Sequence, residues 1–311
     1  MQDYQMMLKA YQKAGGTPDI FKDPRIAHLV VNQNNVLGSQ STDGLTLTAK
    51  EKERGIDVDL EVEEGIRIAH PVHLCFGVLP KEGRQEIRVN AFVKKGAEIR
   101  ILAHCVFPNP IKVQHVMNAL YTLEDRAVLT YEEVHYHGLT GGIEVIPQAK
   151  IKVGKDARIM TNFLLIKGRV GRLDIDYQAE ADENGKIEMV AKVYGHGDDK
   201  IRVKESVLLF GEGARGLIKS RIAVRERAES EVVSELGASA PNARGHVDCV
   251  EIVQGEAVAK AVPVVSVLHK NAQVTHEAAI GRVNQKELET LMARGLKEEE
   301  AVEVIIGGML K

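Results

Sequence analysis

Short runs of alternating hydrophobic and polar residues occupy most of the chain from about Leu29 to Val274. Examples are IDVDLEV, EIRVNAFV, LDIDYQAEA and KIRVKESVLLFG, which are rich in β-branched residues and are separated by Gly, Asn and Asp. Alternation with a period of two places every second side chain on the same face of a strand. The pattern therefore predicts one long β region, and no linker rich in Pro, Gly or Ser divides it.

A weak repeat runs through this β region. Segments such as KKGAEIRI, GKDARIMT, GEGARGLI and GEAVAKAV each place a polar or glycine turn before an alanine and then a strand. The spacing along Ala214, Ala228, Ala257 and Ala272 is 14 or 15 residues, or twice that. A solenoid of stacked parallel sheets gives this spacing, because each turn bends at the same corner and only a small residue fits there. On pattern alone, the alternative is a β-sandwich with irregular hairpins.

Helical patterns flank the β region. The first residues, DYQMMLKAYQKAG, have apolar residues at helical spacing and end at Gly15-Gly16. Near the other end, Asn284 can cap a helix that Arg294-Gly295 closes, and LKEEEAVEVIIGGMLK starts a second helix. The apolar stripes of this tail must pack on the end of the β region or on another protein. We expect a helical or irregular segment over residues 1–60, a β core over 61–281 and a helical segment over 282–311.

The composition of the 311 residues favours a globular protein with an aliphatic core. Hydrophobic residues make up 44% of the chain, whereas aromatic residues make up only 4% and Trp is absent. The formal charge of −3 gives no general attraction to nucleic acid or to an anionic membrane. No apolar run approaches the roughly 20 residues that span a bilayer, and the first residues lack the pattern of a signal peptide. We expect a cytoplasmic protein with no nucleic-acid or membrane partner.

Two short motifs do not indicate a nucleotide-binding site. GEGARG, from Gly211 to Gly216, satisfies the pattern G-x-G-x-x-G, but the following LIKSRIAVRERA alternates like a strand. It supplies no helix N-terminus to hold a pyrophosphate. Lys219-Ser220 comes three residues after Gly216, whereas a P-loop needs Gly, Lys and Ser or Thr in succession. The chain is therefore not expected to be an ATPase.

The segment EVHYHG is a candidate metal site. Glu133, His135 and His137 alternate, so they lie on one face of a strand, and H-x-H is a spacing that binds metal in several β-barrel enzymes. This pattern predicts, as one alternative, an H-x-H mononuclear metalloenzyme on a β fold. A polar face of a sheet is more commonly the face that meets solvent.

The three cysteines, Cys75, Cys105 and Cys249, lie too far apart in the sequence for a local metal knuckle, so any cysteine function uses a free thiol. Cys249 lies in a strand-like run, where a lone cysteine is usually a small buried hydrophobic residue. His276 and Glu277, in VTHEAAIG, are adjacent in a strand and so point to opposite faces. Spacing alone does not decide whether these residues form a site.

Taken together, RGHVDC, AVP, THEAAIG, LMARGLKEEEA and IIGGML resemble the C-terminal half of the SufB/SufD family, the scaffold proteins of Suf iron–sulfur cluster assembly. The resemblance covers residues 215–311 well and the stretch from YEEVHYHG to VYGHGDD, residues 131–199, less sharply. It implies a right-handed parallel β-helix, a mainly β solenoid with helical segments at both ends. It also implies an assembly scaffold rather than an enzyme, with ATP hydrolysis supplied by a partner.

The resemblance further implies the site and the partners. Cys249, His276 and Glu277 match the family's ligands for a transient iron–sulfur cluster, expected to be a 4Fe–4S cluster, and reduced flavin is a candidate further cofactor. Cys105 is a candidate sulfur-entry thiol. Expected partners are a SufC-like ABC ATPase at the C-terminal helices, a cysteine desulfurase as sulfur donor, and a second chain in a homodimer or a SufB–SufD-like heterodimer. A cluster-free, SufD-like structural partner is the alternative, although the presence of Cys249 favours the SufB-like role.

Overall fold

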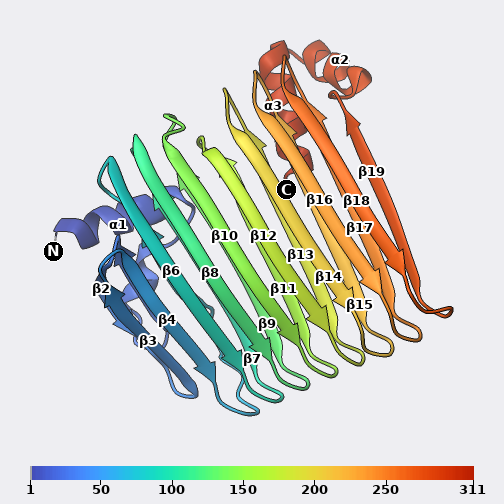
Figure 1. Ribbon diagram of the computed structural model, residues 1–311. Helices are drawn as coiled ribbons and strands as arrows, with labels where there is room; N and C mark the ends of the chain where they lie inside the picture. The colour runs from blue at the N-terminus through green and yellow to red at the C-terminus, as the bar shows by residue number, and fades with distance from the viewer. Residues whose placement is uncertain (1) are drawn as a thin grey trace.

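Two stacked β-sheets form the body of the protein in the computed structural model, which describes residues 2–311 (Figure 1). From β4, Gly55–Val62, onward the chain crosses from one sheet to the other after every strand, and each strand pairs in parallel with the strand one turn later. The result is a β-solenoid of about eight turns, which confirms the predicted fold and excludes a sandwich of hairpins.

The first sheet, sheet A, contains ten strands, listed here in spatial order: β2 Asn35–Gln40, β1 His28–Asn32, β5 Val72–Gly77, β7 Glu98–Phe107, β9 Val128–His137, β11 Arg158–Lys167, β13 Lys186–Gly195, β15 Arg215–Val224, β17 Arg244–Val253 and β19 Gln273–Gly281. The second sheet, sheet B, contains nine: β3 Leu45–Lys52, β4 Gly55–Val62, β6 Glu82–Val93, β8 Lys112–Leu123, β10 Ile143–Val153, β12 Gly171–Ala181, β14 Lys200–Leu209, β16 Glu229–Ala238 and β18 Val258–Val267.

Most turns of the solenoid bend at an alanine that directly precedes a strand, and Gly185 takes this position before β13. Ala127 and Ala157 are fully buried at the corners before β9 and β11. The preceding residues, Arg126 and Asp156, have φ values of 60° and 56°, the left-handed conformation that turns the chain sharply. The carbonyl of Ala127 accepts a hydrogen bond of 2.9 Å from the backbone N–H of Arg158 on the next turn. The alanines singled out by the repeat lie at equivalent corner positions: Ala214, Ala228, Ala257 and Ala272.

The space between the two sheets is filled by stacked rows of inward side chains. Leu165, Val193 and Ile222 are register partners on consecutive strands of sheet A, and all three are completely buried. Burying one such side chain contributes about 1.5–3 kcal/mol, so these rows hold successive turns together. The prediction of an aliphatic core is confirmed over this part of the chain.

The N-terminal boundary expected at residue 60 is wrong, because strands already begin at His28. Strands β1 and β2 pair antiparallel, as do β3 and β4, so two hairpins close the first turn. The loops of these hairpins, residues 33–34 and 53–54, contain no alanine, so the repeat did not extend through them. The helix α1, Gln2–Lys13, and the short 3-10 helix η1, Pro18–Lys22, cover sheet A beside these strands, as Figure 1 shows.

The C-terminal tail forms the two expected helices, α2 Gln285–Ala293 and α3 Glu298–Met309. The Asn284 side chain accepts hydrogen bonds from the N–H groups of Lys286 and Glu287, which confirms the predicted cap. Helix α3 packs on the outer face of sheet A, where Ile306 is buried against Tyr194. One apolar stripe of the tail is therefore covered within the chain itself.

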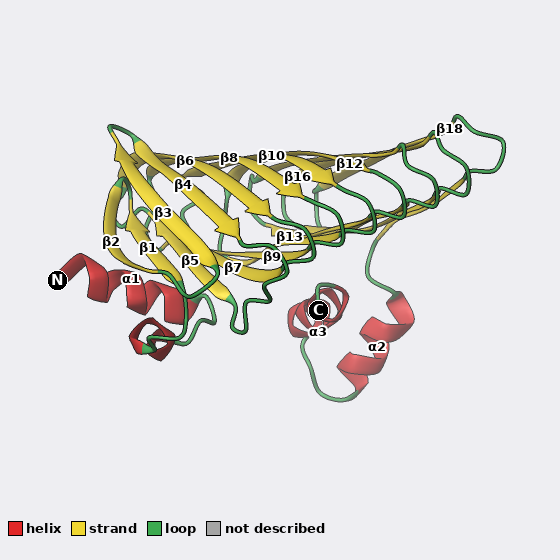
Figure 2. Cartoon of the chain, turned by 90° about the horizontal axis from the view of Figure 1, so that it is seen from below, coloured by secondary structure: helices red, strands yellow, loops and turns green. Residues whose placement is uncertain are grey.

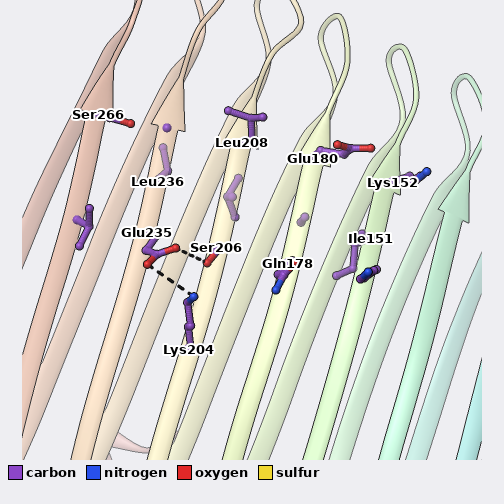
Figure 3. A pocket seen from close by; sticks show the side chains of 15 residues that line it. Ile151, Lys152, Gln178, Glu180, Lys204, Ser206, Leu208, Glu235, Leu236 and Ser266 are labelled. Atoms are coloured by element: carbon purple, nitrogen blue, oxygen red, sulfur yellow. Dashed lines mark hydrogen bonds and ion pairs between the residues drawn. The ribbon is translucent and has the colours of Figure 1, made fainter.

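Both helical segments lie on the side of sheet A, and no helix of the described chain covers the outer face of sheet B (Figure 2). A groove of about 680 Å³ runs over that open face across β10, β12, β14, β16 and β18. Its charged groups are partly paired, since Glu235 accepts a hydrogen bond from Ser206 and lies 3.8 Å from the Lys204 ammonium (Figure 3). None of the predicted site residues lines this groove. Within residues 2–311, no helix has the length and apolar character needed to cross a membrane.

Candidate functional site

Polar side chains gather at two places in the otherwise aliphatic interior of the solenoid. The early cluster lies on β7 and β9 and consists of Cys105, Tyr131, Glu133, His135 and His137. The late cluster lies on β14 to β17 and consists of Glu205, Ser220, Ser234, Cys249 and Glu251. Because a buried polar group without a partner is costly, both clusters call for a functional or structural explanation.

The early cluster brings a thiol, a carboxyl group and an imidazole together. Cys105 and His135 are register partners on β7 and β9, and Glu133 points inward from the same strand as His135. The Cys105 Sγ lies 3.9 Å from Glu133 Oε1, and the same oxygen lies 2.6 Å from His135 Nε2. One ligand atom from each residue lies within 4.8 Å of the other two. All three residues are at most 2% exposed, so this is a fully desolvated group of potential metal ligands.

Hydrogen bonds fix the arrangement of protons in the early cluster. The Arg169 carbonyl oxygen can only accept, so His137 Nδ1–H donates to it at 3.2 Å and His137 Nε2 carries a lone pair. His135 Nδ1 must then donate to His137 Nε2, at 3.1 Å. Neutral His135 therefore directs the lone pair of Nε2 toward Glu133, and one shared proton lies between the two groups. The Tyr131 hydroxyl donates to the other Glu133 oxygen at 2.9 Å.

Burial keeps the early cluster uncharged overall. Desolvation raises the pKa of the Glu133 carboxyl above its ordinary value and lowers the pKa of His135 to about 3. Desolvation, together with the nearby Glu133, also raises the pKa of the Cys105 thiol. A metal-free cluster of this kind holds its protons.

The early cluster corrects the expectation that the EVHYHG face meets solvent. Glu133, His135 and His137 point into the solenoid and are buried, because this face of β9 is the inward one. Both histidines are 2% exposed, and neither lines any of the main surface pockets of the described chain. A substrate would have no room there, which argues against the metalloenzyme alternative. Cys105 is equally enclosed, so a sulfur donor could reach it only after the interior opened.

The late cluster surrounds Cys249. The Cys249 Sγ lies 3.6 Å from the Ser234 hydroxyl oxygen on the opposite sheet, and Ser220 is its register partner on β15. Desolvation raises the pKa of the Cys249 thiol, and the two serine hydroxyls oppose this shift. Glu205 is the register partner of Ser234, so a buried carboxyl group lies one strand away. The thiol is buried, as expected for a small core residue, but its surroundings are polar.

His276 and Glu277 lie on β19, the last strand of sheet A, and both are exposed. The register partner of His276 is Val247, an inward residue two positions before Cys249, so His276 and Cys249 lie on the same face. The partner of Glu277 is Asp248, on the outer face. In a single chain the structure therefore places His276 beside the inward row of Cys249 and places Glu277 on the other side of the strand.

Several buried polar residues in or beside the two clusters were not singled out from the sequence, namely Gln85, His115, Tyr131, Glu205, Ser220, Ser234 and Glu251. The His115 Nδ1 lies 3.0 Å from Gln85 Oε1, and its ring centroid lies 6.0 Å from that of His135. Cys75, in contrast, is buried on the other face of sheet A beneath α1, where desolvation raises its pKa to about 12. Cys75 thus belongs to neither cluster.

Comparisons with a family model and with individual proteins point to the same protein family. Residues 81–309 match the sequence family described as SUF system FeS cluster assembly, SufBD core domain. An iron–sulfur cluster assembly SufBD family protein of Methanocaldococcus jannaschii is 37% identical over 289 residues, which are 93% of this chain and 90% of that protein. A protein of the same description from Pyrococcus horikoshii is 33% identical over 310 residues, 100% of this chain and 94% of that protein. The iron–sulfur cluster assembly protein SufB of Bacillus subtilis is 26% identical over 163 residues, 42% of this chain and 34% of that protein.

Proposed function

Because the chain belongs to the SufBD family of iron–sulfur cluster assembly proteins, we propose that it is the scaffold on which a nascent cluster is built at the open end of the solenoid. The observation that carries the proposal is the placement of Cys249 and His276 on one face of the last two strands of sheet A. A thiolate and an imidazole bind iron and leave exchangeable positions, as a cluster awaiting delivery requires.

The Cys249 thiol would bind iron as a thiolate, so it must lose its proton when iron arrives. The hydroxyl of Ser234, 3.6 Å from the sulfur, can donate a hydrogen bond to that thiolate. Glu277 is a proposed further ligand. Since β19 is the edge strand, its carboxylate can reach around the strand from the outer face.

A second chain is proposed to cover the last turns. Strands β18 and β19 end their sheets with unpaired backbone edges, and exposed apolar side chains accumulate there. A homodimer or a SufB–SufD-like heterodimer formed at this end would bury those groups and enclose a cluster held by Cys249. The apolar residues concerned are Val258, Val264, Val267, Leu268 and Ile280.

The remaining partners would act on this assembly. A SufC-like ATPase is proposed to dock on the tail, where Met292 and Val304 stay exposed after α3 has packed on sheet A. Its ATP hydrolysis would drive opening and closing of the dimer end. A cysteine desulfurase would supply sulfur, and a reductant such as reduced flavin would supply electrons.

Anaerobic reconstitution with the ATPase present tests the proposal. The wild-type chain should gain iron and sulfide in equal amounts, and Cys249→Ser should lose both, because serine keeps the shape but is a poor ligand for iron. His276→Ala should retain the cluster less well than wild type. Cys75→Ser is the matched control, since it changes a buried thiol on the other face of the sheet.

Two outcomes would contradict the scaffold. If Cys249→Ser gained iron and sulfide to the wild-type level, Cys249 would be only a small core residue. If the wild-type chain gained neither element, the cluster-free SufD-like role would take its place.

A further inference from the structure

We propose that the early cluster is a second metal site, separate from the open end, in which Cys105, Glu133 and His135 bind one divalent transition-metal ion inside the solenoid. The fitting ions are those of borderline softness, such as Zn²⁺ or Fe²⁺, because a thiolate and an imidazole disfavour Mg²⁺ and Ca²⁺. The inference does not depend on the proposed scaffold function.

The ligand set balances the charge of the ion. A thiolate and a carboxylate together neutralise a divalent cation, and the third ligand, the imidazole, is neutral. Binding would release two protons, one from the Cys105 thiol and the one shared by Glu133 and His135. The site is thus uncharged before and after binding, which matters because all three residues are at most 2% exposed.

The ring of His135 is already oriented as a ligand. The chain of hydrogen bonds from His135 Nδ1 to His137 Nε2, and from His137 Nδ1 to the Arg169 carbonyl, leaves the lone pair of His135 Nε2 facing Glu133 and Cys105. A metal-bound histidine typically donates its other N–H to such a partner, which sets its tautomer and orientation. His137 would be a positioning residue, because its contact is with the far nitrogen of the ligand.

The distances need only a small adjustment. Ligand atoms around a tetrahedral ion lie about 3.4 Å apart for bonds of roughly 2.0–2.3 Å. The separation of 3.9 Å between Cys105 Sγ and Glu133 Oε1 is close to this value, whereas Glu133 Oε1 and His135 Nε2, now 2.6 Å apart, must move apart as the ion replaces their proton. His115 Nε2 is buried without a hydrogen-bond partner in the described chain, and its ring neighbours that of His135. It is the candidate for the fourth position.

Other turns of the same solenoid indicate that the fold itself does not need these polar groups. The register partner of Glu133 on β11 is Phe163, and the partner of His135 is Leu165. Apolar side chains therefore fill the same inward positions one turn later. The turn after that also has apolar residues in both rows, Ala191 and Val193, and polar side chains return only in the late cluster, at Ser220 and Glu251.

Refolding the full-length chain with Co²⁺ tests the proposal, since the buried site would load during folding. The wild-type chain should take up Co²⁺ and develop the thiolate-to-cobalt charge-transfer absorption of a tetrahedral site. The double variant Cys75→Ser/Cys249→Ser leaves Cys105 as the sole thiol, and it should keep this absorption. Adding Cys105→Ser to this double variant should abolish it. His137→Leu should weaken cobalt binding about 10–100-fold without abolishing the thiolate band.

The double variant Cys75→Ser/Cys249→Ser tests the early metal site even if the Cys105→Ser substitution prevents folding. If refolded Cys75→Ser/Cys249→Ser protein, with cooperative unfolding, showed no thiolate-to-cobalt band, the early site would be refuted. If the thiolate-to-cobalt band were lost only when Cys249 is replaced, the cobalt would lie at the open end. The scaffold proposal would then remain intact. Conversely, a Cys249→Ser chain that fails in cluster assembly but keeps the cobalt band would support both the scaffold proposal and the early metal site.

Discussion

The carboxyl group of Glu205 lies in the interior next to Ser234, and its Oε2 atom has no hydrogen-bond partner in the described chain. Burial raises the pKa of this carboxyl from 4.5 to about 8. The folded protein therefore holds a proton that the unfolded chain releases above about pH 4.5. The stability linked to this proton is fully present below that pH and is lost as the pH rises toward about 8.

Glu205→Gln should remove this pH dependence, because glutamine is uncharged at every pH. At pH 8 the variant should be more stable than wild type by at most about 4 kcal/mol, and the difference should shrink toward pH 5. Denaturant unfolding at pH 8 and at pH 5 measures this difference in the free energy of unfolding. Glu229→Gln, an exposed change on the adjacent strand β16, is the control. An equal gain in the control, or no gain at pH 8 in Glu205→Gln, would count against a protonated interior carboxyl.

The sequence pattern identified part of each cluster but not its full membership. The alternation of Glu133, His135 and His137 correctly placed them on one face. Cys105 was not linked to them, although it lies 30 residues before His135, which is one turn of the solenoid. Alternation indicates which residues share a face, but only the turn length shows which strands become neighbours. The direction of the face, inward or outward, follows from the closure of the two sheets.

The corner alanines differ in how tightly they are enclosed, and this difference predicts different tolerance to larger residues. Ala214 is completely buried, whereas Ala272, near the open end, is only partly buried. Ala214→Leu should overpack the corner and cost about 1–3 kcal/mol. Ala272→Leu should cost less, because solvent can accommodate part of the side chain. Thermal or denaturant unfolding of both variants gives the comparison, and equal costs would contradict the graded burial.

Helix α3 carries two apolar residues, Ile306 and Val304, in different surroundings. Substitutions at these two positions can therefore distinguish an effect on the packing of the tail from an effect on partner binding. Ile306 is buried against sheet A, and Glu303 accepts hydrogen bonds from Tyr194 and Arg225 that hold the helix in place. Val304 is 52% exposed. Ile306→Asp should therefore detach the tail, seen as faster hydrogen exchange in residues 285–310, since a charge cannot be buried there unpaired.

Val304→Asp should leave the tail packed but weaken binding of the ATPase, measured by calorimetry, if the exposed stripe is the docking surface. Unchanged affinity in Val304→Asp would remove that surface from the proposal. Loss of affinity in Ile306→Asp alone would mean that the ATPase needs the packed tail but does not contact Val304.

The solenoid as a whole could be predicted from the sequence because its sequence repeat follows from the geometry of the turns. Each turn reuses one corner, so small residues recur at a fixed interval, whatever fills the strands between them. The two N-terminal hairpins escaped the prediction because they close the first turn by antiparallel pairing and do not repeat. At the other end the stacking of strands stops at β19, and no hairpin within the described residues covers that edge. This asymmetry between a closed first turn and an open last turn is the reason why we propose association at the open end.

Association through the last turns should be lost when a charge replaces an apolar residue there. Val264 on β18 is 47% exposed next to the open edge, and Val264→Asp should weaken dimer formation about tenfold or more, because the carboxylate would be desolvated at the interface. Sedimentation equilibrium of the full-length chain measures the dissociation constant. Leu139→Asp is the matched control, since Leu139 is 80% exposed in the turn between β9 and β10, far from the open end. Equal weakening by both changes would indicate a general effect of charge, and an unchanged dimer in Val264→Asp would place the interface elsewhere.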